Sequence, residues 1–439
     1  MGSLTTAMLS VPRTRKAMVG IIGAFFIQGL LAVAWLPRIP EVIDHLNVPF
    51  SAWGAIVGIA GLGGLVPLLF ANRLINRWGT RPLLQVSYLV AAASIASFGF
   101  IREPIIFFIA LFIQNFGYGV FNIALNSHSV VFQNRIGKVI LGRFHAAWSI
   151  GAASSSLLTG FFASFVSLDF YLLVVAAVSL AVCWFASTLM LSPSEDGHEQ
   201  EKKRAESVPL FKTPSYVILL AVGLFCAVMP EATMMDWSAI FAKRIMHLSP
   251  ALQGAPYTLF VVSMIASRLS IGKLSKRRHL SRVGQIAATM GAFAVSIAAV
   301  LGTLIGGVDP LLSLGVTTIF WILTGLAAGP QVPSYFSMAG SVDTMTTAQA
   351  MSRMSLMNSL FILAVKVVMG GIAQGIGVPF VFVVSVVTFT GASIISGIVV
   401  KRLKSSAAQA EKEAATADQS VDAFPVTSPL AIVSESEIE

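Results

Sequence analysis

Charged side chains are scarce in this sequence. They make up 11% of its 439 residues, whereas hydrophobic residues make up 56%, and a typical soluble domain carries about 25% charged residues. The mean hydropathy is +0.81. Because so few polar side chains cannot cover a folded surface of this size, lipid is the expected solvent for much of the chain. The composition therefore predicts a polytopic α-helical membrane protein.

Cysteine is also nearly absent, since the chain has only Cys183 and Cys226, both in apolar runs. Two such cysteines exclude a disulfide framework and a cysteine-rich metal site. The sequence also lacks P-loop, HExxH and GxSxG motifs, so we expect neither an enzyme nor a bound metal or cofactor. The formal charge of +9 does not indicate a nucleic-acid partner, because Lys and Arg occur in short clusters between apolar runs.

Long apolar runs are what the sequence has in abundance. A helix that crosses a hydrocarbon core of about 30 Å needs roughly 20 apolar residues. Twelve such runs occur, at 17–36, 50–72, 82–101, 105–128, 142–166, 169–190, 215–236, 251–271, 283–305, 309–332, 351–375 and 378–400. We therefore predict an all-α fold with twelve transmembrane helices, embedded in a lipid bilayer.

The basic residues give the expected orientation of these spans. Every second connection is rich in Lys and Arg, from the segment before the first span to Lys401, Arg402 and Lys404 after the last, whereas the intervening connections hold few. The positive-inside rule then predicts a multi-pass protein of the cytoplasmic membrane with both termini in the cytoplasm. The basic N-terminus and the first run also imitate a secretory signal peptide, but the length of the run favours a retained helix.

The twelve runs divide into two similar sets of six. Trp35 and Trp237 each end the first span of their set, and 72–77 (NRLINR) has a counterpart at 272–277 (GKLSKR). We predict an N-terminal six-helix half at 1–190, a cytoplasmic linker at 191–214, a C-terminal six-helix half at 215–404 and a disordered cytoplasmic tail at 405–439. Two repeated halves with a binding site between them are typical of secondary transporters.

The segment 72–81 (NRLINRWGTR) resembles the loop signature G-x-L-x-D-R-x-G-R-K of the major facilitator superfamily. Further segments resemble a bacterial inner-membrane branch distantly similar to fucose:proton symporters and to rhizopine-uptake proteins, at 34–40, 124–126, 145–151 and 231–237. The resemblance implies the major facilitator fold and a leaning toward sugar-like solutes. It also implies a gating loop in each half, formed by Asn76, Arg77, Gly79 and Arg81 and by Gly272, Lys276 and Arg277.

The sequence departs from this family pattern at two points. Asn76 stands where the loop usually has Asp, and an amide can cap a helix but cannot form an ion pair. Lys366 stands in the eleventh span near positions where the branch tends to have Gly and Pro. Because of these two departures, the family's gating and coupling mechanisms cannot be transferred unchanged to this chain.

Polar residues within the spans are candidates for lining a substrate path. Asn115, Asn122 and Asn126 share one helical face of the fourth span, and amides suit hydroxyl-rich solutes. The alternative is that they bond neighbouring helices. Gln28 in the first span has the same two interpretations, and Thr324 and Gln331 in the tenth span mark either a gate or a helix end. Trp35 is interpreted as an anchor at the membrane interface rather than a stacking platform.

Ionisable residues within the spans are the candidates for proton coupling. Glu231 follows Pro230, which predicts a kink in the seventh span, and Asp236 lies further along the same span. Lys366 needs a counter-charge, so it could pair with Glu231, bind an anionic substrate or reach toward an interface. His145 could titrate near neutral pH or serve packing alone.

Together these patterns predict a secondary transporter, expected to be monomeric, that moves a small polar solute with protons by alternating access. Two alternatives remain at this stage, a proton-driven exporter of amphiphilic compounds and a membrane receptor without transport activity. The row of asparagines favours uptake of a polar solute. The large folded cytoplasmic domain expected of a receptor is missing from the sequence.

Overall fold

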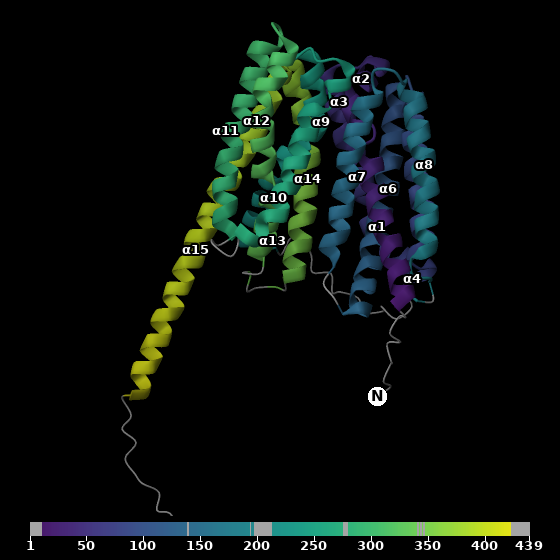
Figure 1. The fold of residues 1–439 in the computed structure, drawn as a ribbon. Helices are drawn as coiled ribbons and strands as arrows, with labels where there is room; N and C mark the ends of the chain where they lie inside the picture. The colour runs from purple at the N-terminus through teal and green to yellow at the C-terminus, as the bar shows by residue number, and fades with distance from the viewer. Residues whose placement is uncertain are drawn as a thin grey trace, which may run out of the picture.

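The computed structural model describes residues 11–137, 140–193, 195–196, 213–274, 280–339, 342, 345 and 347–422. Within these residues every regular element is an α-helix or a short 3-10 helix (Figure 1). The residues before the linker form α1 (Val11–Val33), α2 (Ile39–Leu46), α3 (Phe50–Ala60), α4 (Ala71–Trp78), α5 (Thr80–Ser97), α6 (Pro104–Ile136), α7 (Leu141–Phe162) and α8 (Leu168–Leu189), with the 3-10 helices η1 (Leu36–Arg38), η2 (Gly61–Gly64) and η3 (Val66–Leu69).

The residues after the linker form a second set of helices. These are η5 (Pro250–Leu252), η6 (Val378–Val381), α9 (Ser215–Arg244), α10 (Ala255–Leu274), α11 (Leu280–Gly306), α12 (Pro310–Ala328), α13 (Gln331–Ala339), α14 (Thr347–Gly375) and α15 (Phe382–Asp422). Figure 1 shows the two sets as two bundles side by side, with α2 at one end of the molecule and α4 at the other. We call these ends the α2 end and the α4 end.

Ten stretches of the described chain are long and apolar enough to cross a membrane, and each coincides with a predicted span. The two remaining predicted spans correspond to α5 and α7, which are helices of 18 and 22 residues within the N-terminal bundle. These two are more polar, since α5 contains Arg81 and Gln85 near its start, while α7 contains Arg143, His145 and the run 154–156 of serines. The helical membrane architecture is thus confirmed, and the count of twelve spans stays a prediction.

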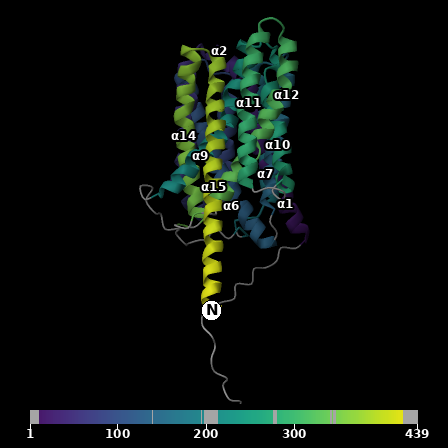
Figure 2. The same cartoon turned by 90° about the vertical axis from the view of Figure 1, so that its left-hand side faces the viewer.

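The chain beyond the last span corrects one expectation. α15 continues without a break to Asp422, so residues 405–422 are helical where we predicted a disordered tail (Figure 2). The sequence there is rich in Ala and also contains Glu and Gln, which have high helix propensity and extend a helix that has already begun. Residues 423–439 lie outside the described part, as do most residues of the predicted linker, 194 and 197–212.

Glycine permits the closest helix contact within the N-terminal bundle. A Cβ atom on Gly151 of α7 would lie 2.0 Å from the carbonyl oxygen of Phe26 in α1, and one on Gly29 would lie 2.0 Å from that of Trp148. Two helices that touch through backbone atoms leave no room for a side chain between them. The position of α1 against α7 therefore depends on both glycines.

Several contacts join the two bundles on the α2 side of the molecule. Asp44 of α2 forms ion pairs with Lys243 and Arg244 of α9. The backbone amide of Phe50 donates to Oε1 of Gln374 at 3.0 Å. In addition, α3 and α14 touch through glycine, because a Cβ atom on Gly54 would lie 2.6 Å from the Cα atom of Gly370. The structure is therefore closed at the α2 end.

Candidate functional site

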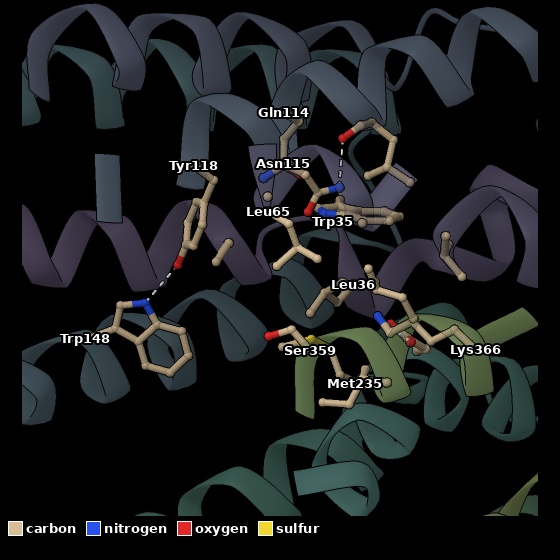
Figure 3. A pocket seen from close by; sticks show the side chains of 18 residues that line it. Trp35, Leu36, Leu65, Gln114, Asn115, Tyr118, Trp148, Met235, Ser359 and Lys366 are labelled. Atoms are coloured by element: carbon tan, nitrogen blue, oxygen red, sulfur yellow. Dashed lines mark hydrogen bonds and ion pairs between the residues drawn. The ribbon is translucent and has the colours of Figure 1, made fainter. Parts of the chain in front are cut away.

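A cavity of about 430 Å³ lies between the two bundles. Its walls come from α1, η1, α3, η2, α6 and α7 on one side and from α9 and α14 on the other, and Figure 3 shows the side chains that line it. This volume is within the range of about 300–1,000 Å³ that is usual for small-molecule sites. Aliphatic and aromatic side chains form most of the wall, and the polar lining residues are Gln114, Asn115, Tyr118, Asp236, Ser359 and Lys366.

An ion pair connects α9 and α14, the two helices that the C-terminal bundle contributes to the cavity wall. Nζ of Lys366 in α14 lies 2.8 Å from Oδ2 of Asp236 in α9, and the two side chains are only 17% and 7% exposed. Oδ2 has no hydrogen bond of good geometry among the described residues, so the contact with Lys366 is mainly electrostatic. Charges withdrawn from water are stable only when they are paired. The pair therefore explains why a lysine and an aspartate can occupy these two spans.

The sequence left open a pairing of Lys366 with Glu231, and the structure does not contain it. Glu231 does not contact Lys366 but pairs with Arg268 of α10, with Oε2 and Nη2 3.2 Å apart. Glu231 and Asp236 are five residues apart on α9. Five residues complete one full turn of a helix and about 140° of the next, so the two side chains point in directions about 140° apart. The two carboxylates therefore face different neighbours, α10 and α14. Arg268 was overlooked as a partner, although it is the one charged residue within the apolar run 251–271.

The asparagines of α6 divide between the two interpretations. Asn115 lines the cavity, and its Nδ2 donates to the carbonyl oxygen of Leu111 at 2.8 Å. Asn122 instead accepts two hydrogen bonds at Oδ1, from Nε2 of the buried Gln28 at 3.2 Å and from Nδ2 of Asn126 at 2.9 Å. Neither Gln28, Asn122 nor Asn126 is among the residues that line the cavity. These three amides connect α1 with α6 in the present conformation.

The remaining sequence candidates lie away from the cavity. Thr324 and Gln331 are fully buried, and Gln331 donates to the carbonyl oxygens of Gly284 and Ala327 at 3.0 and 3.1 Å, which ties the start of α13 to α11. Thr324 donates to the carbonyl of Phe320 in its own helix. His145 lies edge-on against the ring of Phe25, with centroids 5.3 Å apart. The structure does not bring these side chains to the cavity.

Aromatic side chains contribute more to the cavity than the sequence suggested. Trp35 lines it and is also packed against Trp53, Phe98 and Phe107, with ring centroids 5.3–6.2 Å apart. Its interpretation as an interface anchor was wrong, since the helix ends at Val33 and η1 turns the next residues into the bundle. Opposite, Nε1 of Trp148 donates to the hydroxyl of Tyr118 at 3.0 Å (Figure 3). No periodicity in the sequence distinguished these rings from lipid-facing ones.

The predicted gating loop lies at the α4 end. Asn76 and Arg77 are exposed on α4, and Arg81 is half-buried in the first turn of α5. Gly79 between the helices has φ +79°, a conformation that favours glycine. In the second half, Gly272 lies in α10, whereas Lys276 and Arg277 lie outside the described residues.

An acidic residue from another part of the chain caps α5. Oδ2 of Asp196 accepts hydrogen bonds from the backbone amide and the hydroxyl of Thr80, both at 2.8 Å. Nδ1 of His128 lies 2.7 Å from the same hydroxyl. A carboxylate at a helix N-terminus satisfies free amides and the helix dipole. Asp196 thus supplies at this helix the carboxylate that Asn76 lacks.

A second carboxylate of the same segment is held by α1. Glu195 accepts hydrogen bonds from the guanidinium of Arg13, which lower the pKa of this carboxyl to about 2. The start of the predicted linker is therefore anchored to the N-terminal bundle. Among the described residues, no group of three or more His, Cys, Asp or Glu is arranged to hold a metal ion.

Comparison with known proteins identifies the family of the chain. The profile of the Major Facilitator Superfamily matches residues 17–342. An uncharacterized MFS-type transporter of Yersinia pestis is 25% identical over 361 residues, which cover 80% of this chain and 87% of that protein. The membrane protein MosC of Rhizobium meliloti is 18% identical over 381 residues, 85% of this chain and 88% of MosC.

Solved structures are similar over nearly their whole length. A mutant of the nucleoside transporter NupG superimposes with a TM-score of 0.70 at 16% identity, covering 87% of this chain and 98% of that one. A bacterial homologue of the human lysosomal transporter Spinster, inward-facing and occupied, gives a TM-score of 0.67 at 13% identity, with coverage of 90% and 98%. At such identities the likeness shows the fold alone.

Proposed function

Because the chain belongs to the Major Facilitator Superfamily, we propose that it is a secondary active transporter that moves a small polar solute together with protons across the cytoplasmic membrane. Membership of this family makes it a membrane transport protein with a small-molecule substrate and a lipid environment, and so gives it a transport rather than a catalytic role. The proton coupling, the solute class, the cell membrane as location and the monomeric state are proposals.

The ion pair of Asp236 and Lys366 is the observation that carries the proposal. It lies in the wall of a cavity that both bundles line, so any solute in that cavity meets both charges. A carboxylate that takes up a proton loses its attraction to the ammonium, which changes the contact between α9 and α14. The protonation of one side chain is thereby linked to the arrangement of two helices around the solute.

Alternating access requires that the two bundles rock about the cavity. The contacts at the α2 end, including the ion pairs of Asp44 and the glycine contact between α3 and α14, support the view that one side is closed here. The clusters of Lys and Arg favour a cytoplasmic α4 end. We therefore propose that the described conformation is inward-facing, so that opening to the outside requires these α2-end contacts to separate.

We assign the coupling proton to Asp236 rather than to Glu231. Asp236 lines the cavity, whereas Glu231 is held by Arg268 outside the residues that line it. Both carboxylates are on α9, so a single experiment can compare them. The proton would reach Asp236 from one side of the membrane and leave it on the other after the bundles have moved.

Reconstituted protein carrying Asp236→Asn or Glu231→Gln tests this assignment. We expect Asp236→Asn to abolish accumulation of a radiolabelled solute driven by a pH gradient while solute exchange at equal pH continues, because only the coupled step needs the carboxyl. Glu231→Gln should still accumulate solute. If Glu231→Gln loses accumulation and Asp236→Asn keeps it, the coupling proton belongs to Glu231.

Export of amphiphilic cations is the rival function, and the aromatic wall of the cavity favours it. Trp35, Tyr118 and Trp148 offer faces on which a hydrophobic cation could stack. Liposomes that contain the reconstituted protein and an internal pH dye separate the two functions. Internal acidification on addition of polar solutes supports the proposal, whereas pH responses confined to hydrophobic cations would establish the exporter.

A further inference from the structure

The charges in the cavity wall cancel. Among the eighteen residues that line the cavity, Lys366 is the one cation and Asp236 is the one carboxylate, and they form an ion pair with each other. The cavity is therefore neutral while it is empty. Any change in the protonation or pairing of one partner leaves the other as a net charge between the bundles.

This cancellation constrains what can bind when Asp236 is protonated. A neutral Asp236 leaves the ammonium of Lys366 without a counter-charge at a site that is only 17% exposed. Leaving one member of a buried ion pair alone is strongly unfavourable. A neutral sugar would not relieve this cost, whereas a solute that brings its own negative charge would.

We infer that the solute is a small hydroxylated monocarboxylate, whose carboxylate replaces Asp236 on Lys366 while Asp236 takes up one proton. The inference rests on the proposed transport function and names its substrate class. One negative charge matches the single ammonium, since a dianion would leave the occupied cavity with a net charge of its own. Hydroxyl groups of the solute have partners in Gln114 and Asn115 on α6 and in Ser359 on α14, all of which line the cavity.

The exchange balances in charge and protons. The carboxylate of Asp236 gains one proton, its contact with Nζ of Lys366 breaks, and the solute carboxylate forms the new contact with the same ammonium. On the other side of the membrane the solute leaves, Asp236 releases its proton and the original pair forms again. One proton and one anion therefore cross together, and the transport step carries no net charge.

The other ionisable groups near Asp236 are already engaged. Towards the α4 end of α9, Glu231 pairs with Arg268 of α10. On the neighbouring η1 and α2, Arg38 pairs with Glu41, and Asp44 is held by Lys243 and Arg244. Tyr257 of α10 is the neutral group that faces both carboxylates of α9, and its buried hydroxyl has no hydrogen-bond partner among the described residues. Lys366 is left as the cation that responds to protonation of Asp236.

Liposomes containing the full-length protein and an internal pH dye test the substrate class. The probes are D-gluconate and other sugar acids as monocarboxylates, sorbitol and glucose as neutral counterparts, and glucarate as a dianion. We expect sugar-acid uptake with internal acidification, one proton per anion, at a rate unaffected by a potassium–valinomycin potential.

The outcomes separate this inference from the proposed function. Acidification with inward charge movement for the neutral solutes, and none for the sugar acids, overturns the anion class and leaves proton-coupled transport intact. Glucarate transported in preference to the monocarboxylates also overturns it. If none of the polar solutes moves, both the inference and the proposed function fail.

Binding measurements on variants test the role of the pair itself. Sugar-acid binding to the wild type should weaken about tenfold for each pH unit over which Asp236 loses its proton, because one proton binds with each anion. Asp236→Asn should bind with an affinity independent of pH, and Lys366→Met should lose binding by at least about tenfold through the missing charge. Asp309→Asn is the matched control, since Asp309 caps α12 away from the cavity and asparagine caps equally well.

A double variant that replaces both charged residues distinguishes a loss of binding from a folding defect. The double variant Asp236→Asn with Lys366→Gln removes both charges together, so it leaves no unpaired charge in the cavity. We expect it to purify as a monodisperse protein that fails to bind sugar acids at any pH. Retained binding in this variant or in Lys366→Met would overturn the inference.

Discussion

At the scale of single residues, stability and function depend on where a charge finds its partner. Asp236 and Lys366 pair inside the cavity wall, whereas Glu195 and Arg13 pair where water still reaches both side chains. A pair in water contributes little to stability, whereas in a pair withdrawn from water the loss of one charge leaves the other at a high cost. The first kind anchors a segment, and the second kind can couple a proton to a solute.

The Arg13 and Glu195 pair gives a pH-dependent prediction. Arg13 holds the pKa of the Glu195 carboxyl at about 2, below its ordinary value of 4.5, so the stabilisation is complete above pH 4.5 and is lost as pH falls toward 2. Glu195→Gln should lower the free energy of unfolding at pH 7 by roughly 0–1 kcal/mol. The difference from wild type should shrink in melting curves recorded below pH 4.5, and a difference that grows on acidification would contradict the pairing.

Individual residues also show what the sequence could and could not predict at the site. Asp236, Lys366 and Asn115 were identified because a polar side chain in an apolar run is costly and conspicuous. The partner of each charge could not be identified, since the turn of α9 between Glu231 and Asp236 sends them to different helices. Trp35 and Trp148 could not be recognised as cavity residues, because an aromatic ring is equally ordinary facing lipid.

At the scale of helices, small residues decide which contacts can form. The spacing G-x-x-x-G, which is typical of close helix contacts, occurs at Gly54 and Gly58 in the second apolar run and at Gly371 and Gly375 in the eleventh. The structure confirms close contacts for the first pair, but the partner on α14 is Gly370, while Gly371 and Gly375 face open space. A one-residue shift moves a position by about 100° around a helix. Spacing alone therefore identifies the helix without identifying the face.

Adjacent glycines of α14 provide a matched test of this contact. A Cβ atom on Gly370 would lie 2.6 Å from the carbonyl oxygen of Phe50, whereas one on Gly371 meets nothing within 4 Å. Gly370→Ala should therefore destabilise the closed α2 end by about 1–3 kcal/mol, as forced overpacking does elsewhere. Gly371→Ala should be close to wild type in thermal unfolding of the purified protein. Equal melting temperatures for the two variants would show that α3 and α14 do not meet as described.

Helix limits were predictable wherever composition changes abruptly. Ten of the twelve apolar runs coincide with stretches long and apolar enough to cross a membrane, because hydrophobic length is the strongest constraint on such a chain. The helix over residues 405–422 was not predicted, since the tail at 405–439 was expected to be disordered because of its low hydrophobicity, although its many Ala residues favour a helix. The cap of α5 by Asp196 joins residues more than a hundred positions apart, and no local pattern could predict it.

At the scale of the whole molecule, the two bundles and the cavity between them form one mechanical unit. Contacts at the α2 end join the bundles, and the ion pair in the cavity wall joins α9 to α14, the two helices that we propose to respond to protonation. Opening must break ionic and glycine contacts at one end while forming others at the α4 end. Solute and proton shift this balance only as far as they bind the two states differently.

Spin-label distances across both ends of the reconstituted protein test alternating access most directly. In a background of Cys183→Ser and Cys226→Ser, one label pair replaces Ser51 and Ile376 at the α2 end, and another replaces Asn76 and Lys401 at the α4 end, all of them exposed. With solute at acid pH, we predict that the first distance lengthens while the second shortens, and that Asp236→Asn changes how both distances depend on pH. Distances that stay unchanged at both ends under conditions in which transport proceeds would contradict the account.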